Sequence, residues 1–148
     1  MRVIGLDLGS KRIGVAVSDT SATIATPLTV IERNKKQLID HQAIALLVRE
    51  EEAEAVVVGL PLSMSGDMGP AARAAVAECD VLATVVGVPV HLHDERLTTV
   101  AADAVLMEAK MKAQARRRVV DKVAAAVMLQ SWLDARKNAR DGDATGPL

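Results

Sequence analysis

The 148-residue sequence has no Phe and no Tyr, and Trp132 is its only aromatic residue. A protein that binds single strands by stacking successive bases needs several aromatic side chains, so this mode of binding is not expected. The sequence has one cysteine, Cys79, which excludes an internal disulfide and a cysteine metal cluster. We expect Cys79 to be a small core residue, and we expect a cytoplasmic protein.

The sequence also lacks an excess of charge of either sign, with a formal net charge of −1. Any contact with nucleic acid must therefore be local, with bound cations supplying positive charge at a reaction site. No uncharged run approaches the roughly 20 apolar residues that span a bilayer. No signal-peptide pattern is present, so we expect no association with a membrane.

Apolar periodicity and turn residues predict a simple order of secondary structure. The expected elements are strands at 1–8, 13–18 and 24–32, a helix at 36–52, a strand at 55–60, a helix at 71–86, a strand at 88–93, and helices at 98–108 and 120–137. A short connection makes the first two strands an antiparallel hairpin, and Pro27 indicates an edge strand. A meander followed by βα units predicts an α/β domain over 1–137, with a mixed five-stranded sheet and helices on both faces. Residues 138–148 have the composition of a disordered tail.

Carboxylates stand where two of the expected strands end. Asp7 ends an apolar strand, and a divalent cation or the amides of the following turn could offset the cost of burying it. Asp94 and Glu95 end a later strand, at the edge where α/β sheets bind ligands. Alternation puts them on opposite faces. We expect Glu95 to point towards Asp7, and Asp94 can pair with Arg96 at the surface.

A third carboxylate, Asp121, lies near the start of the last expected helix. The helix dipole alone could account for a carboxylate there. The case for function rests on combination, because acids from an early strand, a later strand end and the last helix can converge on one face. Such an all-oxygen site suits Mg²⁺ or Mn²⁺, which keeps waters and binds substrate phosphate. Two such ions can activate water and stabilise a leaving oxygen.

Basic residues adjoin these acids along the chain. We expect them to contact nucleic-acid phosphates, although solvated surface charge would explain them equally well. The residues concerned are Lys11, Arg12, Arg96, Arg116, Arg117 and Arg118.

Four segments, in order along the chain, resemble the YqgF/RuvX family. They are GLDLGSKRIGVAVSD (5–19), VVGLPLSMSG (57–66), DERLTT (94–99) and VDKVAAAVMLQ (120–130). The resemblance implies a ribonuclease-H-like fold related to Holliday-junction resolvases, and a nuclease that matures the 5′ end of precursor 16S ribosomal RNA. It places Asp7, Glu95 and Asp121 at the family's acidic positions. Ser63 and Ser65 replace Asn and Asp of many relatives, which argues against a metal ligand from that loop.

The expected function is metal-dependent cleavage of a nucleic-acid backbone, either structured RNA or branched DNA. A resolvase that cuts two strands symmetrically would favour a homodimer, whereas an RNA-trimming enzyme can be a monomer. One alternative is a non-catalytic module that binds nucleic acid or ribosome-assembly partners, and metal-dependent turnover would distinguish it. An actin-like or sugar-kinase-like ATPase also opens with an Asp-x-Gly hairpin, but it needs two such domains, and this chain is too short for them.

Overall fold

The computed structural model describes residues 1–97 and 113–144, without the side chains of 97, 113–119 and 140–144. The strands are β1 (Arg2–Leu8), β2 (Arg12–Ser18), β3 (Ala25–Glu32), β4 (Ala53–Leu60) and β5 (Val90–Asp94). The helices are α1 (Gln37–Glu50), α2 (Pro70–Val86) and α4 (Ala113–Ala144), and a 3-10 turn, η1, spans Glu95–Leu97. The helix expected at 98–108 lies outside the described residues.

The five strands form one sheet in the order β3-β2-β1-β4-β5. β1 pairs antiparallel with β2 and parallel with β4, and β4 pairs parallel with β5. The expected hairpin and mixed five-stranded sheet are therefore confirmed. Pro27 lies on the edge strand β3, where the register shifts, so its missing amide costs no bond to a further strand.

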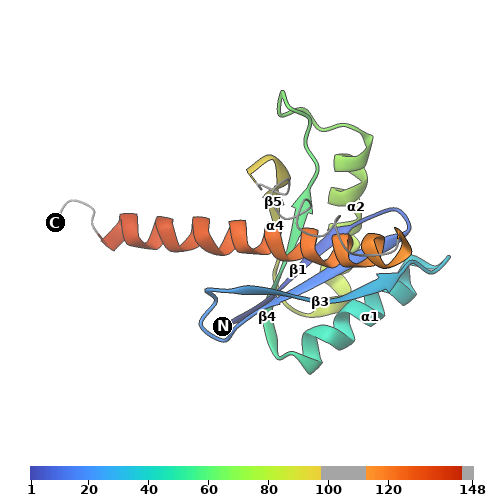
Figure 1. The fold of residues 1–148 in the computed structure, drawn as a ribbon, viewed down its shortest axis with the longest axis horizontal. Coiled ribbons are helices and arrows are strands. Elements are labelled where there is room, and N and C mark those ends of the chain that lie inside the picture. The colour runs from blue at the N-terminus through green and yellow to red at the C-terminus, as the bar shows by residue number, and fades with distance from the viewer. Residues whose placement is uncertain (98–112, 145–148) are drawn as a thin grey trace.

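Helices cover both faces of the sheet, as expected (Figure 1). α1 and α2 pack on one face around Ile4, Leu6 and Val58. α4 packs on the other face, where Val3 and Val57 meet Leu129. Alternate residues of β1 and β4 thus belong to different cores, which is the pleat of a sheet buried on both sides.

Cys79 lies in the first of these cores, and burial raises the pKa of its thiol to about 11. A thiol with a raised pKa is a poor nucleophile. The expectation of a small core residue is confirmed.

The last helix is longer than the sequence predicts. It begins at Ala113 rather than near Val120, and it continues to Ala144 through residues expected to form a tail. The basic residues before Val120 are good helix formers, and their charge is not a reason for a connector. A single glycine, Gly142, costs a helix about 1 kcal/mol but does not end it. Within the described ranges, no helix has the length and apolar character needed to cross a membrane.

Candidate active site

Asp7 lies at the carboxyl end of β1, on the face that α4 covers. It shares that face with Val3 by strand alternation, and it pairs across the hairpin with Gly14. Burial, and then the charge of Asp121, raise the pKa of the Asp7 carboxyl. Among the described residues, no hydrogen bond or ion pair reaches this carboxylate. Asp7 is therefore a partly buried acid whose negative charge has no protein partner there.

Glu95 reaches the same face from η1, directly after β5. Its carboxylate lies over Gly59 of β4, where an added Cβ would be 2.4 Å from Oε1 of Glu95. Gly59 alternates with Val57 of the α4-side core, which fixes the face. Burial raises the pKa of Glu95, and the charges of Asp7 and Asp94 raise it further. The structure thus brings Glu95 and Asp7 into electrostatic contact, and only a glycine leaves room for this arrangement.

Asp121 comes from α4, and a second glycine brings it close. A Cβ on Gly14 would lie 2.0 Å from the backbone oxygen of Asp121, so the helix can pack here only against a bare strand. Because α4 begins at Ala113, Asp121 is two turns inside the helix rather than in its first turn. The helix dipole acts mainly on the terminal turn, so that explanation of Asp121 is wrong.

Arg12 holds the Asp121 carboxylate. Its Nε donates to Oδ2 of Asp121 at 2.6 Å, and both side chains are about three-quarters buried. The hydrogen bond to Asp121 raises the pKa of Arg12. Arg12, expected to contact phosphate, here offsets the charge of one of the three acids.

Asp94 and Arg96 pair with each other, as the sequence allowed. The Arg96 guanidinium donates to both Asp94 oxygens, the shortest contact being 2.6 Å from Nη2 to Oδ2, and Nη1 lies 3.4 Å from the carbonyl of Met64. The hydrogen bond from Arg96 lowers the pKa of Asp94. Arg96 therefore links the η1 segment to the loop after β4, at the outer side of the site.

The remaining basic residues differ in what is known of them. Lys11 is exposed at the tip of the β1–β2 turn. The side chains of Arg116, Arg117 and Arg118 lie outside the described residues, so their expected contact with phosphates stays a prediction. Ser63 and Ser65 bond to each other and, with Asp67, close the loop on itself.

The donor chemistry of these acids fits a hard divalent cation, which takes oxygen ligands. Asp7 and Glu95 raise each other's cost of ionisation, and a bound cation would reverse that effect. Within the described part of the chain, no three His, Cys, Asp or Glu side chains are close enough to hold a metal as they stand. Asp121 is instead paired with Arg12.

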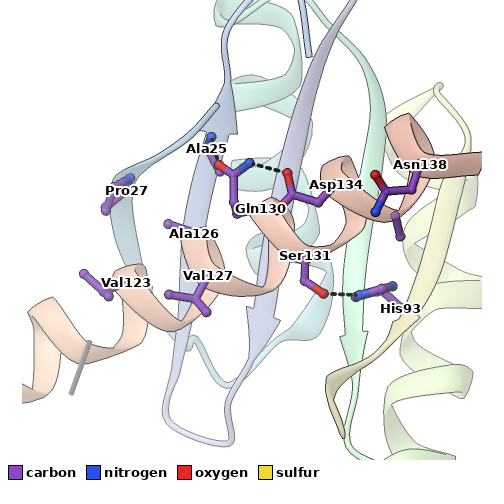
Figure 2. Close-up of a pocket in the computed structure, with 11 residues that line it drawn as sticks. Ala25, Pro27, His93, Val123, Ala126, Val127, Gln130, Ser131, Asp134 and Asn138 are labelled. Carbon is purple, nitrogen blue, oxygen red and sulfur yellow. Dashed lines mark hydrogen bonds between the residues drawn. The ribbon is translucent and has the colours of Figure 1, made fainter. Parts of the chain in front are cut away.

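An open cavity of about 670 Å³ lies along α4, away from these acids (Figure 2). His93 borders it, is 8% exposed and shares a 3.0 Å hydrogen bond with Ser131. Burial lowers the pKa of His93, so the ring favours its neutral form. The lining is largely aliphatic, and none of the three acids contributes to it. The cavity is therefore not the site of the carboxylates.

Sequence reasoning missed the two glycines that make the site possible. Gly14 and Gly59 interrupt strands otherwise built from β-branched and apolar residues. A glycine inside such a strand marks a close approach, and that signal was available. Which element approaches each glycine could be known only from the fold.

Comparison with known proteins identifies relatives along most of the chain. The sequence model of a family described as RuvX: Holliday junction resolvase matches residues 1–135. A protein of Myxococcus xanthus named "Putative pre-16S rRNA nuclease" is 48% identical over 137 residues, covering 93% of this chain and 90% of that one. A protein of Moorella thermoacetica with the same name is 49% identical over 134 residues, covering 90% and 95%.

Solved structures share the arrangement of strands and helices. RuvC of T. thermophilus in complex with a Holliday junction substrate has a TM-score of 0.60 and 20% identity, covering 93% of this chain and 96% of that one. A further T. thermophilus RuvC structure has a TM-score of 0.55 and 19% identity. Likeness at this identity concerns the fold, and it confirms the expected ribonuclease-H-like architecture.

Proposed function

This chain belongs to the RuvX Holliday junction resolvase family, and from that membership we propose that it is a metal-dependent nuclease that hydrolyses nucleic-acid phosphodiesters. The observation that carries the proposal is the mutual charge repulsion of acids from separate elements. Asp7 feels the charge of Asp121, and Glu95 feels the charge of Asp7. Such crowding costs stability, and groups with shifted pKa values are typical of functional sites.

The residues that would hold Mg²⁺ or Mn²⁺ are Asp7, Glu95 and Asp121. A bound cation of this kind supplies charge stabilisation and an activated water for attack on phosphorus. Arg12 would orient Asp121, and the exposed Lys11 would meet an incoming phosphate. Gly59 leaves the space in which the Glu95 carboxylate lies.

We propose precursor 16S ribosomal RNA, at its 5′ end, as the substrate. The support is the name shared by relatives that are 48% and 49% identical over nearly the whole chain. The family description favours a second candidate, branched DNA, for which a homodimer would be required to cut both strands symmetrically.

A cleavage panel tests both candidates. The purified protein is incubated with precursor 16S RNA, unrelated single-stranded RNA, duplex DNA and four-way DNA junctions, each with Mg²⁺, Mn²⁺ or excess chelator. We expect metal-dependent cleavage of the precursor at its 5′ end. Preferential cleavage of the junction would assign branched DNA instead. Tight binding of RNA without cleavage in any metal would indicate a non-catalytic module and would refute the proposal.

A further inference from the structure

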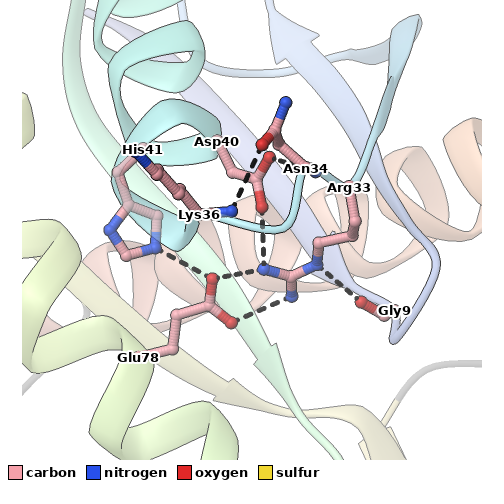
Figure 3. A network of polar contacts seen from close by, with 7 residues as sticks. All are labelled: Gly9, Arg33, Asn34, Lys36, Asp40, His41 and Glu78. Atoms are coloured by element: carbon pink, nitrogen blue, oxygen red, sulfur yellow. Dashed lines mark hydrogen bonds and ion pairs between the residues drawn. The ribbon is translucent and has the colours of Figure 1, made fainter.

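A buried polar cluster lies on the opposite face of the sheet from the acids, between α1, α2 and the segment after β3 (Figure 3). Arg33 donates from Nη1 and Nη2 to the two carboxylate oxygens of Glu78, at 2.6 and 2.9 Å. Nε2 of His41 lies 2.8 Å from Glu78, and Asp40 is 3.6 Å from Nη1 of Arg33. His41 is fully buried, and Asp40 and Glu78 nearly so.

The cluster does not end at the carboxylates, because Arg33 also holds the β1–β2 turn. Its Nε donates to the carbonyl of Gly9 at 3.0 Å. Its backbone amide donates to the carbonyl of Lys11 at 2.9 Å. One residue thus fixes the turn at both of its sides, once through the guanidinium and once through the main chain.

The turn in question carries two parts of the candidate active site. The Gly9 amide donates to the carbonyl of Asp7 at 3.1 Å, so the position of Gly9 sets the end of β1. Arg12 at the other end of the turn holds Asp121 at 2.6 Å. A displacement of the turn would therefore move Asp7 and the partner of Asp121 together.

Glu78 keeps the Arg33 guanidinium in the orientation that reaches Gly9. Burial disfavours a charged Glu78, but the hydrogen bonds from Arg33 and His41 outweigh it and lower the pKa of the carboxyl. The pair is therefore ionised, with both of its oxygens engaged. A buried ion pair is often no more stabilising than apolar residues of the same volume. Its geometric effect on the turn is the feature that apolar residues would not reproduce.

We propose that Arg33, oriented by Glu78, is a positioning residue that sets the β1–β2 turn and through it the placement of Asp7 and Arg12. The inference rests on the proposed nuclease function for its effect on rate. Its effect on the turn does not depend on that function.

The test uses Arg33→Lys, which keeps the charge but cannot donate to Gly9 and to both Glu78 oxygens at once. The milder Glu78→Gln keeps the test decisive if Arg33→Lys does not fold. Arg2→Lys is the matched control, because Arg2 also binds a carboxylate, that of Glu51 at 3.1 Å, but at the amino end of β1. Each variant is assayed with the full-length protein, well below its melting temperature.

Two readouts separate positioning from general stability. Loss of a residue that orients an active-site group costs about 10–100-fold, so we expect kcat on the best substrate of the panel to fall by that factor in Arg33→Lys. We expect KM to change by less than about threefold, because phosphate contacts remain. Amide hydrogen exchange at residues 9–12 should quicken, while exchange in α4 and β4 stays as in the wild type. Glu78→Gln should shift both readouts in the same direction, and Arg2→Lys neither.

Wild-type kcat and wild-type exchange at residues 9–12 in Arg33→Lys would overturn the inference. An equal loss of kcat in Arg2→Lys would overturn it too, since the effect would then follow stability alone. If the wild-type protein cleaves no substrate, the proposed function fails, and exchange at residues 9–12 alone decides whether Arg33 sets the turn.

Discussion

The sharpest test of how the site is built is the substitution Gly59→Ala. The new Cβ would lie 2.4 Å from Oε1, 2.9 Å from Cγ and 3.0 Å from Cδ of Glu95. Non-bonded carbon atoms rest about 3.5–4.0 Å apart, so the Glu95 side chain must move by about 1 Å. Every clashing atom belongs to a flexible side chain, and the backbone can stay in place.

Activity and stability should therefore respond differently to Gly59→Ala. A displacement of about 1 Å of a catalytic group can cost on the order of 100-fold in rate, so we expect kcat to fall between tenfold and that figure. In a strand, alanine is favoured over glycine by about 0.5–1 kcal/mol. That gain offsets the shift of Glu95, and the free energy of unfolding should change by less than about 1 kcal/mol.

Two other glycines provide the contrast. Gly87 ends α2 with a φ of 72° and has open space around it, so Gly87→Ala should cost stability, by about 1–2 kcal/mol, and leave kcat unchanged. Gly14→Ala clashes with the backbone of Asp121 and should lower both stability and kcat. The assays are cleavage kinetics and urea unfolding. Wild-type kcat in Gly59→Ala would refute the placement of Glu95 in the reaction.

Three further outcomes follow from charge. The pKa of Asp7 is raised by burial and by Asp121 above its ordinary 3.8, so the stability linked to this group is fully present below pH 3.8 and is lost as the pH rises through the folded-state pKa. Asp7→Asn should therefore raise the melting temperature of metal-free protein at pH 7, with the difference vanishing below pH 3.8 in thermal scans. Neutralising Arg116, Arg117 and Arg118 together should flatten the log–log salt dependence of substrate binding by somewhat under about 1 for each phosphate that the protein no longer neutralises, and an unchanged slope would place them on a solvated face. Cleavage should require Mg²⁺ or Mn²⁺ and be poorly supported by Ca²⁺, so full activity in excess chelator would contradict the metal site.

The order of strands and helices could be read from the sequence because the relevant patterns are local. Alternation in β1, the short turn after Asp7 and the apolar run of β4 each act over a few residues, and together they predict the mixed sheet. The start of α4 could not be read in the same way, because a run of charged residues is compatible with a connector as well as with a helix. Residues with long charged side chains are good helix formers, and the longer helix places Asp121 in its interior.

The candidate acids could be predicted, but not what surrounds them. Alternation alone predicts that Glu95, not Asp94, shares the face of Asp7. The Arg12–Asp121 pair joins residues 109 positions apart, and the Arg33–Glu78 pair joins residues 45 apart. No local pattern encodes such contacts, which depend on how α4 and α2 pack on the two faces of the sheet.

The central claim is that Asp7, Glu95 and Asp121 act as one catalytic unit. Single-turnover cleavage rates of Asp7→Asn, Glu95→Gln, Asp121→Asn and their pairwise combinations test it most directly, with circular dichroism as the check on folding. The account predicts that each single variant loses most of the rate, and that a second substitution costs far less than the product of the single losses. Near-wild-type rates in all three single variants, in folded protein on the best substrate, would contradict it.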